Sequence, residues 1–335
     1  MIRTLPPAEF ARWERYSTLP EMTRSRLGPD SRWLKSGRMM HFVAEDGPRF
    51  IGRVSAFVNP RMQDQPLPTG VIGALDFAPE AFDRDEAELR RLLEAAFAWL
   101  ASNGMRTARG PIDFSTWNAY RAITFSNGYP AFFGENQLDA RYGVLLDDMM
   151  TPVQFYRSAL ITDTERAQQV ARLARVDRAG AEHGIGIRAI APGDVLAQMP
   201  TLYQLASRIY TAEYAYSPTG ADEFHELMYG MSQTAPDFHM LVADAPSGEP
   251  IALCFGYAAP GLPKKTAVLR TFGVVPEWQS RNVSYLVAYR FHMDLLARGY
   301  ENFIHALMRE DDRSRHMSDY YATKFRGYTL YERNI

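Results

Sequence analysis

The stretch that decides the fold is TAVLRTFGVVPEWQSRNVS, residues 266–284. Its first nine residues are mostly apolar or β-branched and favour a strand, and the chain after it carries apolar residues at helical spacing over 281–298. A short polar loop joins the two. The loop amides and the positive end of the helix dipole converge there, so this unit is either a phosphate-binding site or an ordinary strand–helix connection.

The helix of this unit has a counterpart earlier in the chain. Residues 85–103 predict an amphipathic helix closed by Gly104, just as Gly299 closes the helix at 281–298. A strand is predicted after each glycine, at 105–110 and 300–307. The two glycines are 195 positions apart, which predicts a duplicated domain rather than a solenoid of short repeats.

Strand-like runs precede both helices, so each half predicts a mixed α/β sheet. The expected strands are 39–45, 50–59, 71–77, 185–190, 238–243, 250–258 and 265–275, with a last helix at 312–324 and a last strand at 328–333. The segment TDTE at 162–165 is typical of a capping box that begins a helix ending near residue 182. We therefore expect an N-terminal lobe over 1–160, a connector helix on the surface within 161–184, and a C-terminal lobe over 185–335.

Composition narrows the classes of function. The chain has 37 basic and 39 acidic residues and a net charge of −2, which gives no signature of a nucleic-acid or membrane partner. Its single cysteine, Cys254, cannot form an internal disulfide, and the polar N-terminal segment does not resemble a signal peptide. No run of about 18 apolar residues is present to span a bilayer. These features predict a soluble, cytoplasmic protein.

Residues 185–333 resemble the GNAT superfamily of acyl-CoA-dependent N-acyltransferases in strand and helix order and in the position of the polar loop. The run IHALMREDDRSRHMSDYYATKFRGYTLYER, residues 304–333, is similar to the C-terminal signature of bacterial GNAT proteins of comparable length, and residues 109–133 resemble their first half. The resemblance thus covers nearly the whole chain. It implies an α/β protein of two tandem GNAT-like lobes, with the chemistry in the C-terminal lobe.

The same resemblance implies acetyl-CoA, or another acyl-CoA, as co-substrate. Its pantetheine would lie in a gap beside Phe272, Gly273 and Val274, where a main-chain amide near Val274 would polarise the thioester carbonyl. Its pyrophosphate would lie on a loop whose family pattern is Q/R-x-x-G-x-G/A, here Gln279, Ser280, Arg281, Asn282, Val283 and Ser284. Gln279 matches the pattern, whereas Asn282 and Ser284 replace the two small residues. Asparagine is the residue that best tolerates a left-handed conformation after glycine.

Three residues are candidates for catalysis. In the superfamily a tyrosine after the fifth strand often protonates the departing thiolate, and the resemblance places this role on Tyr321, within the expected helix 312–324. The phenol is a suitable acid because it stays protonated at neutral pH. His305 and Glu213 are alternative general bases, and a relayed water is a third possibility. A packing role is the competing interpretation for each. Asp312 stands where the similar proteins usually carry asparagine, and is grouped with the CoA-binding residues.

Other features complete these expectations. Tyr203, Tyr210, Tyr214 and Tyr216 would wall the acceptor pocket or fill the core. Residues 78–86 are acidic and lack the phosphate-loop pattern, so the first lobe is expected to be structural and to complete that pocket. No P-loop, G-x-S-x-G or H-E-x-x-H motif is present, and no metal is expected.

The resulting hypothesis is acyl transfer to the primary amine of a small molecule, and a homodimer is compatible with it. Two alternatives stay open. One is a tandem GNAT transferase that uses an aminoacyl-tRNA donor, and the other is a ligand-binding protein without turnover.

Overall fold

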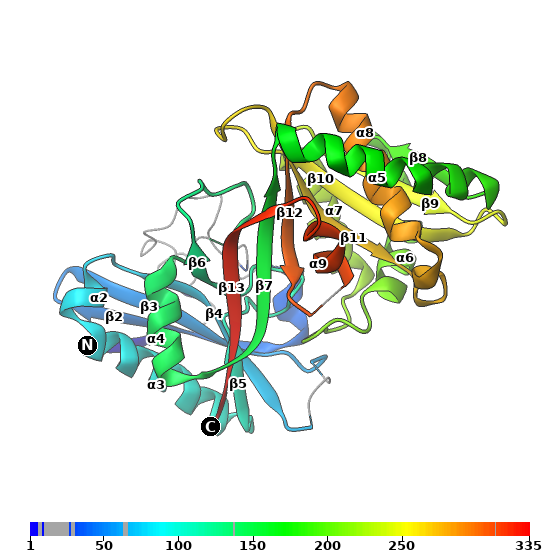
Figure 1. The fold of residues 1–335 in the computed structure, drawn as a ribbon. Helices are drawn as coiled ribbons and strands as arrows, with labels where there is room; N and C mark the ends of the chain where they lie inside the picture. The colour runs from blue at the N-terminus through cyan, green and yellow to red at the C-terminus, as the bar shows by residue number, and fades with distance from the viewer. Residues whose placement is uncertain (6–8, 10–26, 28–30, 63–65, 137, 312) are drawn as a thin grey trace.

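The computed structural model describes residues 1–335 except 6–8, 10–26, 28–30, 63–65, 137 and 312. The strands of both halves form one mixed sheet, in the order β1-β2-β3-β4-β5-β13-β7-β12-β11-β10-β9-β8, with β6 paired to β13 (Figure 1).

Strands with antiparallel neighbours make up most of each half, and one parallel pair occurs in each: β4 with β5, and β11 with β12. The strands of the first half are β1 (Ile2–Leu5), β2 (Arg38–Asp46), β3 (Arg49–Val58), β4 (Thr69–Phe77), β5 (Thr107–Gly110), β6 (Ala122–Ser126) and β7 (Thr151–Ile161). Those of the second half are β8 (Gly186–Ile190), β9 (His239–Asp244), β10 (Pro250–Ala258), β11 (Thr266–Val274), β12 (Asn302–Arg309) and β13 (Thr323–Asn334).

Helices cover both faces of this sheet. In the first half they are η3 (Arg32–Ser36), α2 (Ala81–Arg84), α3 (Glu86–Ser102) and α4 (Ala140–Met149). In the second half they are α5 (Asp163–Glu182), η4 (Pro192–Asp194), α6 (Val195–Ile209), α7 (Ala221–Thr234), η5 (Pro276–Arg281), α8 (Val283–Ala297) and α9 (Arg313–Ser318). Gly104 and Gly299 follow α3 and α8 with φ of 86° and 80°, the left-handed conformation expected of a glycine that closes a helix.

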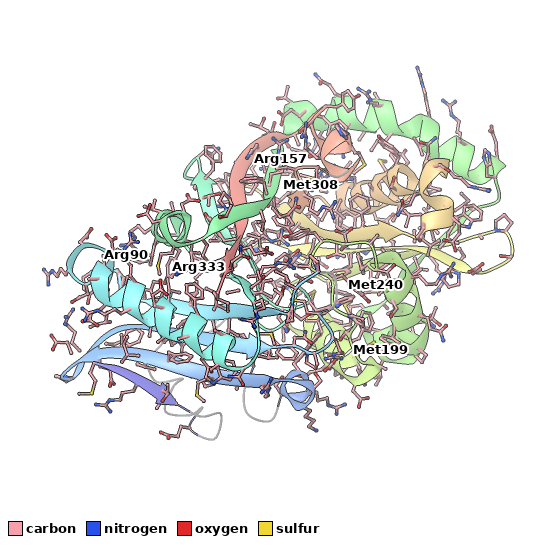
Figure 2. All side chains as sticks on the ribbon, turned by 90° about the horizontal axis from the view of Figure 1, so that it is seen from below. Arg90, Arg157, Met199, Met240, Met308 and Arg333 are labelled. Carbon is pink, nitrogen blue, oxygen red and sulfur yellow. The ribbon has the colours of Figure 1, made fainter. Side chains whose placement is uncertain are left out.

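The two halves exchange strands at the centre of the sheet. β7 comes from the first half but pairs with β12, while β13 comes from the second half and pairs with β5 on one side and β7 on the other. Arg333 on β13 forms an ion pair with Glu94 of α3, and Figure 2 shows Arg333 among the elements of the first half. In the same view Arg157 of β7 lies beside Met308 of β12, its partner in the register. Each half therefore contains a strand that belongs in sequence to the other.

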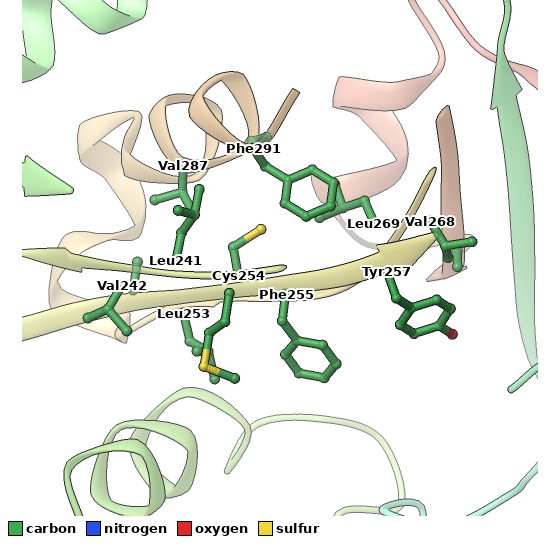
Figure 3. Packing of buried hydrophobic residues seen from close by; sticks show 14 of the residues in the cluster. Leu241, Val242, Leu253, Cys254, Phe255, Tyr257, Val268, Leu269, Val287 and Phe291 are labelled. Carbon is green, nitrogen blue, oxygen red and sulfur yellow. The ribbon is translucent and has the colours of Figure 1, made fainter. Parts of the chain in front are cut away.

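The core of the second half lies on both sides of β10 and β11. Alternate side chains of β10 point to opposite faces: Figure 3 shows Cys254 on the side of α8, near Val287 and Phe291, and Leu253 and Phe255 on the other side. The second face is covered by α6, and α7 packs against α6. Cys254 is buried, and burial raises the pKa of its thiol well above its usual value, so it serves as a packing residue.

Helix α5 begins with the expected capping box, formed by Thr162 and Glu165. Although we expected it on the surface, it also has a buried side that packs along α8. A Cβ atom on Gly180 would lie 2.4 Å from Leu286 Cδ2, so the glycine allows the close approach of the two helices. Gln169 is buried in the same interface.

The structure corrects one element of the predicted site. The expected helix at 312–324 is wrong, because α9 ends at Ser318 and the last strand begins at Thr323. Residues from Thr323 onward pair with β7, and this sheet pairing overrides the local helical pattern. Tyr321 therefore lies in the turn between α9 and β13 and not on a helix.

Candidate active site

An opening separates β11 from β12. Their parallel pairing runs from Thr266 and Asn302 to Leu269 and His305, where it stops, although both strands continue. β11 stays paired to β10 up to Val274, so only its edge facing β12 loses its strand partner.

A bulge lies on each strand at the point where the pairing stops. In β11, Arg270 is an extra residue without a partner in the register with β10. In β12, two residues, Ala306 and Leu307, lie opposite a single residue of β7, and Leu307 adopts φ 62°. Bulges bend strands and redirect side chains beside functional sites. The sequence therefore builds the opening with one inserted residue in each strand.

The polar loop after β11 is a 3-10 helix followed by a left-handed residue. Asn282 adopts φ 58° and ψ 16° immediately before α8, so the asparagine takes the backbone conformation that glycine would take. Gln279, Ser280, Arg281 and Asn282 are exposed, Val283 is buried and Ser284 is half-buried.

Contacts within this loop hold its shape. The Gln279 amide donates to the carbonyl of Val274 at 3.2 Å, and the Arg281 guanidinium lies 4.6 Å from the ring centre of Trp278. The first amides of α8 have no intrahelical acceptor, as at every helix N-terminus, and they face the exposed loop. The arrangement is suited to bind an anion there.

A cavity of about 220 Å³ lies beside the opening, on the face covered by α6 and α7. The second half lines it with residues of β10, β11, β12 and α7 and with the segment after α6, among them Tyr210, Glu213, Tyr214, Tyr216, Phe224, Arg270, Phe272 and His305. Tyr203 packs against Phe224 behind this wall. Gly273 is in close contact with Ile209 of α6, where an added Cβ would lie 2.2 Å from Ile209 Cγ2.

The first half completes the wall of this cavity with Thr116, Trp117, Tyr120, Arg121 and Tyr156. The loop of the first half that carries Ser115 and Trp117 is held to the segment after α6 by hydrogen bonds to Ser217. The Trp117 indole donates to the Ser217 carbonyl at 3.1 Å, and the Ser115 and Ser217 hydroxyls lie 2.8 Å apart. The two halves therefore share one cavity.

Arg121 is the most unusual residue of the cavity. Its guanidinium carbon lies 3.7 Å from the ring centre of Tyr120 and 3.9 Å from that of Tyr156, and it donates to the Leu307 carbonyl at 2.9 Å. Burial lowers the pKa of Arg121 to about 9, and the positive charge of Arg270 acts in the same direction. Neither Arg121 nor Arg270 could be recognised from the sequence. Tyr156 and Leu307 are far from Arg121 in the chain, and no local pattern links them.

The two candidate bases have different surroundings. Glu213 lines the cavity, its side chain is 47% exposed, and its carboxylate lies 3.2 Å from Arg309. His305 is buried, with Nδ1 at 3.1 Å from the Ser318 hydroxyl and Nε2 at 3.0 Å from Nε2 of His292. Burial lowers the pKa of His305 well below its usual value. Of the two, Glu213 is the group that a ligand in the cavity can reach without breaking a buried hydrogen bond.

Tyr321 lies on the other side of the opening. Its ring is 6.3 Å from that of His305, centre to centre, and only 4% of the residue is exposed. Burial raises the pKa of its phenol. The neighbouring groups that also affect this pKa are Tyr285 in the first turn of α8, and Arg172 and Gln169 on α5. The phenol is therefore protonated and close to the start of α8. Tyr320 is exposed and stacks with Arg172 instead.

The corresponding opening in the first half is filled. β4 and β5 also stop pairing after three residue pairs, ending at Val71 and Arg109. The carboxylate of Asp113 then accepts a hydrogen bond from the amide of Ala74 at 2.6 Å, and a Cβ on Gly73 would lie 2.2 Å from the carbonyl oxygen of Ile112. The chain itself therefore fills the opening of the first half.

Other site types receive no support from the described parts of the chain. No group of three or more His, Cys, Asp or Glu side chains there could hold a metal ion. Within the same residues, no helix combines the length and the apolar character needed to cross a bilayer. Asp312, expected beside the cofactor, lies outside the described residues.

Comparison with solved structures identifies the fold. A tandem GNAT protein from the clavulanic acid biosynthesis pathway, solved without acetyl-CoA, superposes with a TM-score of 0.56 at 13% identity and covers 100% of this chain and 98% of its own. A probable N-acyltransferase from Enterococcus faecalis V583 gives a TM-score of 0.57 at 10% identity, over 100% of this chain and 72% of its own. No protein-family model and no curated protein matches the sequence.

A third structure is the glucosamine N-acetyltransferase region of a fungal multi-domain β-N-acetylglucosaminidase. It gives a TM-score of 0.59 at 12% identity and covers 99% of this chain but 38% of its own. The chain thus has the mixed α/β fold of the tandem GCN5-related N-acetyltransferases, as the sequence predicted. Fold alone leaves substrate and chemistry to be argued from the site.

Proposed function

We propose that this protein transfers an acyl group, most simply acetyl, from acyl-CoA to the primary amine of a small molecule. The observation that carries the proposal is the opening between β11 and β12, which leads to the left-handed Asn282 at the start of α8. A pantetheine arm laid in the opening can pair with the main-chain edge of β11, while its pyrophosphate meets the loop amides and Arg281. The filled opening of the first half supports a single donor site.

In the proposed reaction the acceptor enters from the cavity on the α6–α7 face. Glu213, or a water beside it, removes a proton from the ammonium, and the neutral amine attacks the thioester carbonyl. A C–N bond forms and the C–S bond breaks. Tyr321 then gives its proton to the thiolate. The nitrogen loses its second proton as the amide forms, and this proton restores the phenol through solvent, while Glu213 releases the first proton to solvent. A main-chain amide near Val274 would stabilise the oxyanion. His305 holds its neighbours in place and takes no proton in this scheme.

Donor binding is tested by calorimetry with acetyl-CoA and with acetyl-pantetheine, which lacks the pyrophosphate. Reversing the charge at the loop with Arg281→Glu should weaken acetyl-CoA about 10-fold or more, as expected for a lost charge-assisted hydrogen bond, and should leave acetyl-pantetheine unchanged. Arg90→Glu on α3 is the matched control, because Arg90 lies in the first half and pairs with Glu86 and Asp148. No heat and no thermal shift with acetyl-CoA would contradict the proposal.

Turnover is tested by release of free thiol from acetyl-CoA with a set of primary amines. Tyr321→Phe should lower kcat by about 100-fold or more while leaving the dissociation constant of acetyl-CoA within a factor of about three, because general acid catalysis contributes on that scale. Binding of acetyl-CoA without thiol release by the unmodified protein would instead assign a ligand-binding role.

A further inference from the structure

Two arginines of the cavity have no carboxylate partner among the described residues. Arg121 is 2% exposed and Arg270 is half-buried, and neither forms an ion pair with an aspartate or glutamate in the parts of the chain that the structure describes. Arg309, the third arginine of the lining, does have such partners, Glu213 and Asp311. Neither of these guanidinium groups is thus in direct contact with a carboxylate in the described part of the chain.

The hydrogen bonds of Arg121 are incomplete as well. One terminal nitrogen donates to the Leu307 carbonyl, whereas Nε is buried and donates to no described residue. The hydroxyl of Tyr210, on the same cavity wall, is also buried without a hydrogen-bond partner in the described structure. A buried polar group left without a partner is costly, and a site built in this way gains affinity for a ligand that supplies the missing acceptor.

Arg121 and Arg270 act on one another. The charge of Arg270 disfavours the charged form of Arg121, so the two guanidinium groups repel across the cavity. The charge of Arg270 also acts on the buried Tyr257 hydroxyl, which donates to the Phe133 carbonyl at 2.7 Å. Arg270 is the bulged residue of β11, and it lines the cavity. An anion placed between the two arginines would remove the repulsion and fill the vacant donors.

We propose that Arg121 and Arg270 bind the carboxylate of the acceptor, so that the substrate class is a small amino acid or a related amino-carboxylate. The inference rests on the proposed function for the fate of the amine, but the anion site stands on its own geometry. The rings of Tyr120 and Tyr156 flank the Arg121 guanidinium, and a planar carboxylate is the anion that the planar guanidinium fork matches best. The cavity, about 220 Å³, limits the occupant to a small molecule.

The position of the site also fits the proposed chemistry. Arg121 contacts the carbonyl of Leu307, the bulged residue of β12 at the opening, so a carboxylate held there would keep the rest of an acceptor beside the donor gap. Glu213 lines the same cavity and would be near the amine end of the molecule. Because Arg121 comes from the first half, this half would take part in selecting the acceptor.

Binding is measured by calorimetry without any donor, so that the result does not depend on turnover. The probes are a set of amino acids, the corresponding C-terminal amides and inorganic phosphate. At least one amino acid should bind about 10-fold or more tightly than its amide, as expected for hydrogen bonds to a charged group. Equal binding of acids and amides would overturn the proposal. Phosphate binding in place of the amino acids, with the same dependence on both arginines, would overturn the carboxylate assignment and leave a phosphate site.

Two variants locate the site. Arg270→Gln removes one charge, and Arg121→Lys keeps the charge but loses the planar fork; each should reduce the ratio of acid to amide affinity by about 10-fold. Arg90→Gln removes a distant positive charge and should keep the ratio. If Arg121→Lys does not fold, Arg270→Gln alone decides, and an unchanged ratio in that variant would refute the site. Acyl transfer without preference for acids would refute only this inference, whereas tight binding of acids without any thiol release would refute only the transferase.

Discussion

The Nε2 atoms of His305 and His292 lie 3.0 Å apart in the interior of the second half. Nδ1 of His292 is 2.6 Å from the Ala288 carbonyl and must donate to it, so Nε2 of His292 is an acceptor and His305 donates to it. Nδ1 of His305 then accepts from the Ser318 hydroxyl. Both rings are neutral in this arrangement, and a proton added to Nε2 of His292 would place two N–H groups against each other.

This relationship predicts how stability depends on pH. Burial lowers the pKa of His292 and of His41 from an ordinary value of 6.5 to about 4, and it also lowers the pKa of His305 well below that ordinary value. Below pH 6.5 the unfolded chain therefore binds protons that the native protein refuses. The free energy of unfolding should fall as pH drops from about 6.5 toward 4, by up to about 4 kcal/mol per pH unit for three groups.

Urea unfolding at pH 7, 6 and 5 measures this effect. The matched control is His316→Gln, which removes an exposed histidine and should leave the pH dependence of the free energy of unfolding unchanged. His41→Gln should make the profile shallower. A free energy of unfolding that stays constant between pH 7 and 5 would show that these rings are not buried in the neutral form.

Asn282 allows a test of the loop conformation. Alanine at this position must adopt φ near 58° with no side-chain compensation, so Asn282→Ala should lower the free energy of unfolding by about 1 kcal/mol. Asn282→Gly should be neutral or stabilising, and it should not weaken acetyl-CoA. The measurement is chemical denaturation, followed by calorimetry. Equal stability of the alanine and glycine variants would argue against the left-handed conformation.

Two glycines of the second half should respond in opposite ways to alanine. A Cβ on Gly256 would lie 2.0 Å from the Val268 carbonyl and 2.5 Å from Phe291 Cζ, so Gly256→Ala forces backbone atoms apart and should cost about 3 kcal/mol or more. Gly230 lies inside α7 with no atom within 4 Å of the added Cβ, and Gly230→Ala should gain about 1 kcal/mol in helix propensity. Thermal and urea unfolding of the pair provide the comparison, and a Gly256→Ala variant as stable as the parent would contradict the close packing.

The exchanged strands predict that neither half folds alone. Residues 1–161 lack β13, which lies between β5 and β7, and residues 162–335 lack β7, which covers the edge of β12. Each isolated half should aggregate through its unpaired strand edges, and both halves produced together should assemble into a soluble complex. Gel filtration measures the association state of each half, and circular dichroism measures its secondary structure. A monomeric, folded first half would contradict the exchange of strands.

Much of the fold could be predicted from local patterns. The apolar run Pro250–Ala258 predicted a strand with the same ends as in the structure. The glycines after α3 and α8 marked the end of each helix, because their left-handed conformation excludes most other residues. Local patterns failed where a distant partner decided the outcome. Tyr321 follows a helix-like run, but pairing with β7 makes a strand of the chain from Thr323 onward. The exchange of β7 and β13 could not be predicted from local sequence either. The alternation of side chains along a strand indicates which face is buried, but it does not indicate which strand lies beside it.

The candidate site divides in the same way. The loop from Gln279 to Ser284 could be recognised because its chemistry is continuous in the sequence, and the left-handed Asn282 agrees with the tolerance of that residue type. The roles proposed for Tyr321, Glu213 and the loop stay predictions. Arg121 could not be found, because its environment consists of Tyr156, Leu307 and Arg270, which are brought to it only by the folded sheet.

The central position of β13 has a consequence for synthesis of the protein. β7 ends at Ile161 and β13 begins at Thr323, so β5 and then β7 are synthesised before the strand that joins them, β7 by about 160 residues. At ordinary rates of translation this interval lasts about 8 to 30 s. Throughout it two strand edges are exposed to neighbouring nascent chains, and the first half reaches its native pairing only after translation of the second.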